Sequence, residues 1–345
     1  STERKRMIKR PDYPPADTQI VMRSVLIALV PGIIAMTLFF GVGVLFNLAT
    51  AIPAALAAEA MCLSLRQRPI LSRLNDLSAV LTGALIALSL PQAAPWWLII
   101  LASTSSIVLG KHLYGGLGQN PVNPAMLGYA LMLISAPVTM TTLWIDPLAT
   151  PDLTTAWLAY LGQSSDAVTG ATMLDLYRTE FLVLTAAEAS QNPLFMQAHL
   201  GLIYGYEWVA LAYLVGGLWL IYQRVITWHT PVGLLVTLAV VSAFFSFDPD
   251  TATPVWIHLT AGAGIFAAFF ILTDPVSGAT SPKGRLWFAI GVGILTYLIR
   301  TYGLYPDAIA FAVLLMNFAV PMIDHYTRPR IMGRSSSIRG SGGQS

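Results

Sequence analysis

The stretch VMRSVLIALVPGIIAMTLFFGVGV, residues 21–44, carries a single charged side chain, Arg23. A run of about 20 apolar residues is long enough for a helix to cross a lipid bilayer, and runs of this kind recur along the 345-residue chain. The chain is 55% hydrophobic and only 10% charged. Because a soluble domain carries about 25% charged residues, this composition predicts an all-α polytopic membrane protein.

Hydropathy predicts about ten transmembrane helices. They are expected near residues 21–44, 46–65, 78–91, 95–110, 125–143, 204–222, 231–247, 255–273, 286–300 and 308–323. Five spans precede one long segment outside the membrane, and five follow it. The expected units are a tail (1–20), a first membrane half (21–143), an outer loop (144–203), a second half (204–324) and a second tail (325–345).

The basic residues predict the orientation, because cytoplasmic loops carry an excess of Lys and Arg. With the N- and C-termini in the cytoplasm, 17 of the 19 Lys and Arg residues fall on the inner side. Only Arg178 and Arg300 then fall outside. The opposite orientation would break the positive-inside rule almost everywhere, so we reject it.

The two halves resemble each other weakly in sequence. Residues 74–91, LNDLSAVLTGALIALSLP, parallel residues 257–275, IHLTAGAGIFAAFFILTDP. Residues 120–134 similarly parallel residues 305–320. An odd number of spans in each half would make the two five-helix repeats inverted, a plan that is common where a site lies near the membrane midplane.

Two strings spell almost the same word: DAVTGAT, residues 166–172, and DPVSGAT, residues 274–280. The predicted topology puts Thr172 outside and Thr280 inside. A threonine hydroxyl can attack a phosphorus atom, and a nearby carboxylate such as Asp166 can take the proton or hold a metal. The second string is rich in turn residues and is interpreted as a cytoplasmic turn.

DAVTGATML is similar to the flavinylation motif, in which the last threonine of the Gly-Ala-Thr string carries FMN through its phosphate. KHLYGGLGQNPVNPAMLGY (111–129), LPQAAPWW (90–97) and TDPVSGATSPKGRLWF (273–288) resemble the D subunit of Rnf-type ion-translocating electron-transport complexes. The related B subunit of the sodium-translocating NADH:quinone oxidoreductase shares this plan. The resemblance extends from the first expected helix to the tenth.

The resemblance implies that Thr172 bears FMN, with Asp166, Thr169, Gly170 and Ala171 as the recognition sequence. It also implies a bacterial inner membrane location, with the Thr172 loop on the periplasmic side, where the flavin transferase works. The family need not have a complete Gly-Ala-Thr in its TDPV segment, so Thr280 is a departure from the pattern.

A second, non-covalent flavin (riboflavin) is also implied by the resemblance. We place it near GGLGQNPVNPA, residues 115–125, where Asn120 and Asn123 could hydrogen-bond a flat heterocycle. The alternative is a helix-breaking re-entrant turn capped by Asn123, because irregular backbone is tolerated where it is buried.

Glu59 lies in an apolar span, and an ionisable group within a membrane is a candidate for an ion pathway. The alternative is that its carboxylate reaches toward Arg66 at the basic end of the span. The single cysteine and the five scattered histidines show no spacing for an iron–sulfur cluster or a zinc site held by this chain alone.

These patterns and the resemblance together predict a membrane flavoprotein subunit that relays electrons between ferredoxin- or NADH-linked partner subunits and couples this electron flow to the movement of Na⁺ or H⁺. With no NAD fingerprint and no cysteine cluster, it is not catalytic alone and needs iron–sulfur and flavin-bearing partner subunits. The scattered basic residues do not favour nucleic acid. The rival class is an inverted-repeat transporter or channel without a redox role, in which the Gly-Ala-Thr strings are only turns.

Overall fold

The structure, a computed structural model, describes residues 18–146, 150–163, 169–170, 174, 205–245, 255–303 and 308–327. Most of these residues are helical. Three described helices are long and apolar enough to cross a membrane: α1 (Thr18–Phe40), α2 (Gly43–Leu65) and α17 (Ile309–Thr327). The chain is therefore a multi-pass membrane protein.

The other described helices are shorter or less apolar, and two of them run directly into a π-helical segment (η). In the first half they are α3 (Ile70–Leu74), α4 (Ser78–Ser89), α5 (Trp96–Ile107), η1 (Val108–His112), α6 (Pro124–Ser135) and α7 (Pro137–Thr142). After α7 come β1 (Trp144–Ile145), α8 (Leu153–Tyr160) and β2 (Thr169–Gly170). The second half holds α12 (Tyr206–Tyr222), α13 (His229–Phe245), α14 (Val255–Thr260), α15 (Gly264–Phe266), η2 (Ala267–Ile271) and α16 (Pro282–Tyr302).

Helices thus occupy each region where the sequence predicts a span, but two of the regions are interrupted. In 125–143, α6 ends at Ser135 and α7 begins at Pro137, because proline has no N–H to donate within a helix. In 255–273, the backbone unwinds between α14 and α15, and Ala263 takes the left-handed conformation (φ 55°). The number of membrane crossings remains a prediction.

Each half is a bundle of its own helices. In the first, α2 packs along α4 and α5, and in the second α13 packs along α16. The halves meet where α1 packs along α12. A Cβ atom on Gly216 of α12 would overlap the carbonyl oxygen of Ala28 of α1. The backbones of the two helices therefore touch at the centre of the molecule, as small residues allow in membrane bundles.

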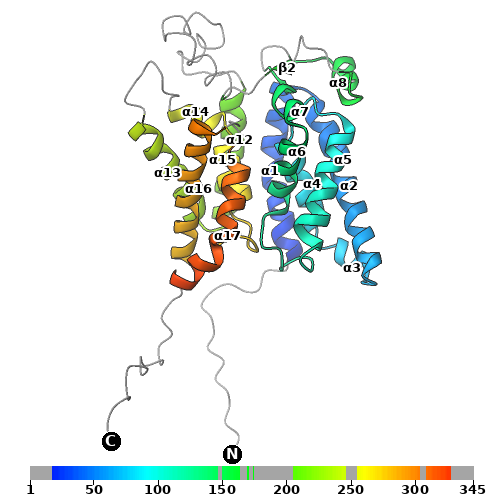
Figure 1. Cartoon of the computed structure of the whole chain (residues 1–345). Coiled ribbons are helices and arrows are strands. Elements are labelled where there is room, and N and C mark those ends of the chain that lie inside the picture. Colours follow the sequence, from blue (N-terminus) through cyan, green and yellow to red (C-terminus); the bar gives the residue numbers. More distant parts are fainter. Residues whose placement is uncertain are drawn as a thin grey trace, which may run out of the picture.

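Different helices and strands lie at the two ends of the bundle (Figure 1). The start of α1, the helix α3 and the end of α17 lie at one end. At the opposite end lie α8, α14 and β2, which pairs antiparallel with β1. We call these the inner end and the outer end. Arg66, Arg68 and Arg73, which flank or lie in α3, belong to the inner end.

Candidate functional site

Two residues of the DAVTGAT string are described, and they lie at the outer end. Asp166, Ala171 and Thr172 lie outside the described residues, whereas Thr169 and Gly170 form β2. In the strand pair, Gly170 is opposite Trp144 and Thr169 is opposite Ile145. These two residues of the string thus pair with the strand that follows α7.

Leu174, two residues beyond Thr172, forms a second contact. It is buried, with 4% of its surface exposed. A Cβ atom on Gly262 would overlap both Leu174 and the guanidinium of Arg300. Leu174 therefore lies against the unwound segment between α14 and α15, beside Arg300.

Arg300, on α16, is buried at the outer end. Its guanidinium donates to the backbone oxygen of His258 over 2.7 Å, and also to the backbone oxygen of Gly262. These carbonyls lie at the C-terminal end of α14, where a cation is favoured by the helix dipole. Arg300 thus holds the broken end of α14 in place.

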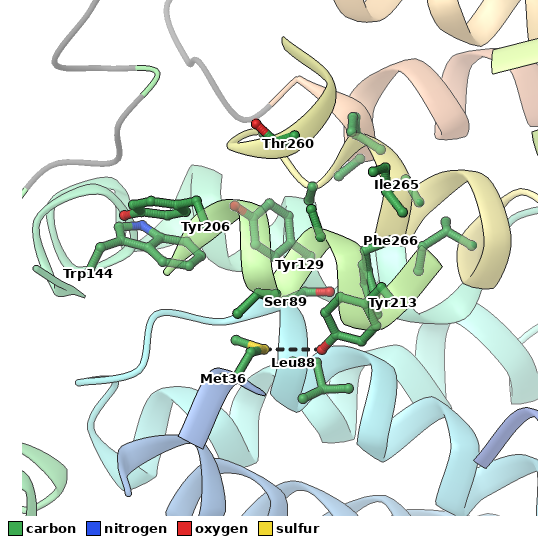
Figure 2. A pocket seen from close by; sticks show the side chains of 18 of the residues that line it. Met36, Leu88, Ser89, Tyr129, Trp144, Tyr206, Tyr213, Thr260, Ile265 and Phe266 are labelled. Atoms are coloured by element: carbon green, nitrogen blue, oxygen red, sulfur yellow. Dashed lines mark hydrogen bonds between the residues drawn. The ribbon is translucent and has the colours of Figure 1, made fainter. Parts of the chain in front are cut away.

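A cavity of about 140 Å³ opens between the halves at this end, and we call it the outer cavity (Figure 2). Its aromatic lining comes from distant parts of the chain: Phe40, Tyr129, Trp144, Tyr206, Tyr213 and Phe266. The broken segment contributes Thr260, Gly262 and Ala263. The Tyr213 hydroxyl donates to the sulfur of Met36 over 3.1 Å, drawn as a dashed line in Figure 2.

A second cavity, of about 360 Å³, lies between the halves at the inner end, and we call it the inner cavity. Asn120 and Asn123 both line it. Asn120 donates to the backbone oxygen of Val122 over 3.0 Å. Asn123 accepts from the backbone N–H of Met126 over 3.2 Å and donates to the oxygen of Ile271 over 3.3 Å. Asn123 therefore does cap α6, and it also borders a space large enough for a ligand.

The inner cavity has further polar groups that the sequence did not single out, Ser78, Thr82, Lys111 and Asp274. The carboxylate of Asp274 accepts from the hydroxyl of Ser277 over 2.6 Å and from the N–H of Val276 over 3.2 Å. Burial raises the pKa of Asp274, and these hydrogen bonds partly oppose the shift.

The inner Gly-Ala-Thr string forms the turn that its composition predicts. The N–H of Gly278 donates to the oxygen of Asp274 over 3.2 Å, which closes the turn. Both the N–H and the hydroxyl of Thr280 donate to Asp324 near the end of α17, each over 3.0 Å. Ser281 then caps α16, accepting from the N–H of Gly284 over 2.9 Å.

Glu59 does not reach toward Arg66. The Lys111 ammonium donates to both carboxylate oxygens of Glu59, over 2.9 and 2.8 Å, and to the hydroxyl of Ser78 over 2.7 Å. His112 Nε2 lies 3.1 Å from the same carboxylate. Arg66 instead donates to the backbone oxygen of His112. Glu59 and Lys111 are thus a buried ion pair between α2 and the π-helical segment η1.

The sequence missed Lys111, Asp274 and Arg300 as members of these sites. From the sequence, we used Lys111 and Arg300 only to orient the helices across the membrane, and we interpreted Asp274 only as a turn residue. Lys111 contacts Glu59 across 52 positions of sequence, and Arg300 contacts His258 across 42. The sequence feature that could have identified Lys111 is its position as a basic residue at the edge of an apolar run.

Two helical halves that enclose an inner and an outer cavity, with broken helices at the cavity walls, are typical of a membrane protein that handles ions or small molecules. Residues 13–333 match the model of the NQR2, RnfD, RnfE family, and the chain belongs to this family.

Curated relatives match along nearly the whole chain. The D subunit of the ion-translocating oxidoreductase complex of Marinobacter nauticus is 48% identical over 335 residues, 95% of each chain. The protein of the same name from Pseudomonas aeruginosa is 49% identical over 328 residues, 94% of each chain. That from Salmonella arizonae is 46% identical over 335 residues, 92% of this chain and 94% of the relative.

Proposed function

We propose that this chain is the membrane-embedded flavoprotein subunit of an ion-translocating oxidoreductase complex. It relays electrons through FMN attached to Thr172 and through riboflavin, and the complex couples this flow to movement of Na⁺ or H⁺. The membership in the NQR2, RnfD, RnfE family and the names of relatives that align along more than nine-tenths of the chain carry the proposal.

The surroundings of DAVTGAT support its role as the attachment site. Gly170 and Leu174, which flank Thr172, contact the outer end of the membrane bundle, opposite the basic helix α3. By the positive-inside rule, the outer end faces the periplasm. A transferase on that side of the inner membrane would therefore meet this segment.

The inner cavity fits a riboflavin ring. A flat heterocycle with polar edges needs an apolar slot and a few converging hydrogen-bonding groups. The cavity has apolar walls from α1 and α4, and its lining also includes Asn120, Asn123 and Asp274. Bound flavins supply one- and two-electron chemistry, and these side chains would hold and orient the ring.

The positions of the two cavities suit an electron relay. Helix α4 contributes Leu85 to the inner cavity and Leu88 to the outer one. Three residues of helix rise about 4.5 Å. On α4, the walls of the two cavities are thus about one helical turn apart. Flavins in the two cavities would therefore lie close to each other, one toward each side of the membrane.

We also propose that the halves are inverted repeats of five membrane helices each, giving ten spans with both termini in the cytoplasm. The cavities support this symmetry. The inner one is lined by the starts of α1, α4 and α6 (Thr18, Ser78 and Pro124). The outer one is lined by the starts of α12 and α17 (Tyr206 and Ile309) and by Ala263, just before α15.

Glu59 is a candidate for the ion pathway. Its carboxylate is buried in the inner part of the first half, and a cavity of about 20 Å³ lies between it, Arg66 and Asp76. A cation entering from the inner end would have to compete with Lys111 for this carboxylate. Partner subunits that carry iron–sulfur clusters or further flavins must deliver and remove the electrons.

Covalent flavin is the direct test of this function. The chain is produced together with the flavin transferase, denatured, separated on a gel and viewed under ultraviolet light. We expect a fluorescent band that disappears in Thr172→Ala, and an intact mass that exceeds the chain by one FMN phosphoester. A colourless wild-type protein would show that the proposal is wrong.

The second candidate is an inverted-repeat transporter without a redox role. It is favoured by the pair of cavities on opposite sides and by the helix break between α14 and α15, features that secondary transporters share. A transporter predicts that Thr172→Ala leaves ion movement intact and that no flavin copurifies. The gel experiment therefore separates the two functions.

A further inference from the structure

We propose that the basic turn between α2 and α3 binds the phosphate of an anionic phospholipid, in the leaflet at the inner end of the bundle. Arg66, Arg68 and Arg73, which we call the arginine site, bind the phosphate, and the acyl chains lie along Leu65 and Leu71. This inference does not involve the flavins, so its test is independent of the proposed function.

The chain between α2 and α3 folds back on itself, and this brings the three arginines together. Helix α2 ends at Leu65, and Gln67 takes the left-handed conformation (φ 52°). The backbone N–H of Arg68 donates to the oxygen of Leu63 over 3.0 Å, so the chain returns over the last turn of α2. Helix α3 then carries Arg73. The three arginine side chains therefore line one cavity.

This cavity is the small one beside Glu59, with a volume of about 20 Å³. Its polar lining consists of Glu59, Arg66, Arg68, Arg73, Asp76 and His112. A water molecule needs roughly 10–15 Å³ of such space, so the cavity admits about one or two oxygen atoms of a headgroup while the rest of the lipid lies outside. His112 is buried, and its Nδ1 has no hydrogen-bond partner among the described residues. Because buried polar atoms are nearly always hydrogen-bonded, this lining favours a polar occupant.

The lining of the cavity has an excess of positive charge. The carboxylate of Glu59 is paired with Lys111, at 2.8 Å. Besides Glu59, the lining has three arginines and one further carboxylate, Asp76, which accepts from the N–H of Ser78 over 2.8 Å. A bound phosphate would offset this excess of charge. It would also reduce the repulsion that a cation approaching Glu59 meets from the arginines.

The guanidinium groups are available to bind an anion. Arg66 is oriented by one hydrogen bond, which it donates to the backbone oxygen of His112. Arg68 and Arg73 are exposed, and their side chains make no hydrogen bond or salt bridge within the part of the chain that the structure describes. A guanidinium presents several N–H donors in one plane and binds phosphate oxygens in pairs. One oriented arginine and two unengaged ones therefore suit a phosphate group.

Exposed apolar side chains beside the arginine site favour a lipid as the source of this phosphate. Leu65 is 79% exposed and Leu71 is 85% exposed. Met61, four residues before Leu65 on the same face of α2, is 51% exposed. An exposed apolar face of a helix that can cross the membrane thus continues as far as the arginines. A phospholipid matches both features, because its headgroup binds cations and its chains cover apolar side chains.

The position of α3 fits contact with lipid. Helix α3 lies at the edge of the first half, on the side away from the second half (Figure 1). Basic residues at the cytoplasmic end of membrane helices attract anionic lipids, and the positive-inside rule assigns the inner end to the cytoplasm. The arginine site therefore lies where the inner leaflet presents its headgroups.

The test uses the full chain, purified in detergent and stripped of lipid, and two double variants. Arg68→Gln with Arg73→Gln removes two cations of the arginine site and leaves Arg66, which bonds to the backbone, in place. The matched control is Arg23→Gln with Arg224→Gln. It removes two exposed cations, near the start of α1 and after the end of α12, that do not line the cavity.

The readout is the fraction of the chain that binds dioleoyl phosphatidylglycerol, counted by native mass spectrometry as the lipid is titrated. We expect the arginine-site variant to bind about tenfold more weakly than the wild type and the control to stay within about twofold, since each nearby cation adds to the affinity for anionic lipid. Equal losses in both variants would show a general attraction to the basic end and would overturn the site. Unchanged binding in the arginine-site variant would overturn it as well.

Two further probes identify what the wild type binds. Dioleoyl phosphatidylcholine has the same acyl chains but no net charge, so it should bind about tenfold more weakly. Inorganic phosphate at the same concentration should not displace phosphatidylglycerol, because it makes no contact with Leu65 and Leu71. Equal binding of the two lipids would contradict the role of the arginines, and displacement by phosphate would contradict a lipid as its source.

A photoreactive phosphatidylglycerol, with a diazirine in one acyl chain, locates the lipid in membranes that contain the assembled complex. After irradiation, peptide mapping should find the label on residues 61–74, and at least about twofold less of it in the arginine-site variant. Label in the isolated chain but not in the complex would show that a partner protein covers the arginines. That result would overturn the lipid site.

Discussion

Asp324 accepts two hydrogen bonds from Thr280, one from its backbone N–H and one from its hydroxyl, each 3.0 Å long. The contact joins the end of α17 to the turn before α16, across 44 positions of sequence. It answers the question raised by the second Gly-Ala-Thr string: the hydroxyl that would be modified is used to join two helices.

The first prediction is that Thr280 carries no flavin. Its hydroxyl donates to Asp324, and it lies at the basic end of the bundle, opposite the end at which we propose that the transferase acts. Peptide mapping of the flavinylated protein should assign the added mass to Thr172 alone. Thr280→Val should keep the fluorescent band at full intensity, whereas Thr172→Val should lose it.

A band that survives in Thr172→Val and vanishes in Thr280→Val would reverse the proposed orientation of the whole chain. The two valine variants are matched in chemistry, because each removes one hydroxyl at the same place in one of two nearly identical strings. The experiment therefore tests the orientation as well as the site.

The second prediction concerns the buried pair of Glu59 and Lys111, whose side chains are 4% and 2% exposed. Removing one partner of a buried pair leaves an unpaired charge and costs about 3–5 kcal/mol. Lys111→Met should therefore lower the thermal midpoint in detergent strongly. Adding Glu59→Gln should restore part of the loss.

Arg73→Met is the control, because Arg73 is an exposed cation at the same end of the bundle. It should change the midpoint little. The coupling between Lys111 and Glu59 in the double-mutant cycle is expected to reach about 1–3 kcal/mol. Additive effects would show that the two side chains do not depend on each other.

The sequence predicted the helices well and the side-chain contacts poorly, for a physical reason. Length and apolar composition alone place a membrane helix, so α2 and α12 lie within a few residues of their expected bounds. The helix cap at Asn123 and the turn in the second Gly-Ala-Thr string could also be predicted from the sequence. These features depend on residues that are neighbours in the chain.

The partners of Glu59 and Arg300 depend instead on how helices pack. Arg66 is seven residues from Glu59 and was the natural local partner, yet Lys111, 52 positions away, takes that role. The π-helical segment η1 carries Lys111 and His112 to the same carboxylate. The helix break at Ala263 was also hidden, since alanine gives no sign of a left-handed conformation.

The third prediction separates the two roles of Asn123. Serine caps a helix about as well as asparagine but lacks the amide donor. Asn123→Ser should thus keep most of the stability of the chain while the riboflavin extracted by acid falls well below one per chain. Asn123→Ala should lose riboflavin and also about 1 kcal/mol of stability.

Asn75→Ser, at the exposed end of α3, is the control and should retain full riboflavin content. Riboflavin bound at one per chain in a folded Asn123→Ala protein would place this cofactor elsewhere. The measurement is chromatography of the extract, read separately from the gel band that reports covalent FMN.

The fourth prediction tests the contact between Gly262 and Arg300. A methyl group at position 262 would overlap the guanidinium and Leu174, both of which are held in place. Gly262→Ala should therefore loosen the segment after Thr172 from the bundle and lower the covalent flavin per chain, about twofold or more, as read from the fluorescence of the gel band. Arg300→Lys should lower the covalent flavin per chain in the same way. A lysine ammonium cannot donate to two carbonyl oxygens with the geometry of the planar guanidinium.

The control for this contact is the same change at Gly291. A methyl group there meets only the flexible end of Met316, so Gly291→Ala should leave the flavin content unchanged. A loss in Gly262→Ala without a loss in Gly291→Ala then reflects the contact and not the added methyl group. Full flavinylation of both Gly262→Ala and Arg300→Lys would show that the outer end of α14 does not position the attachment segment.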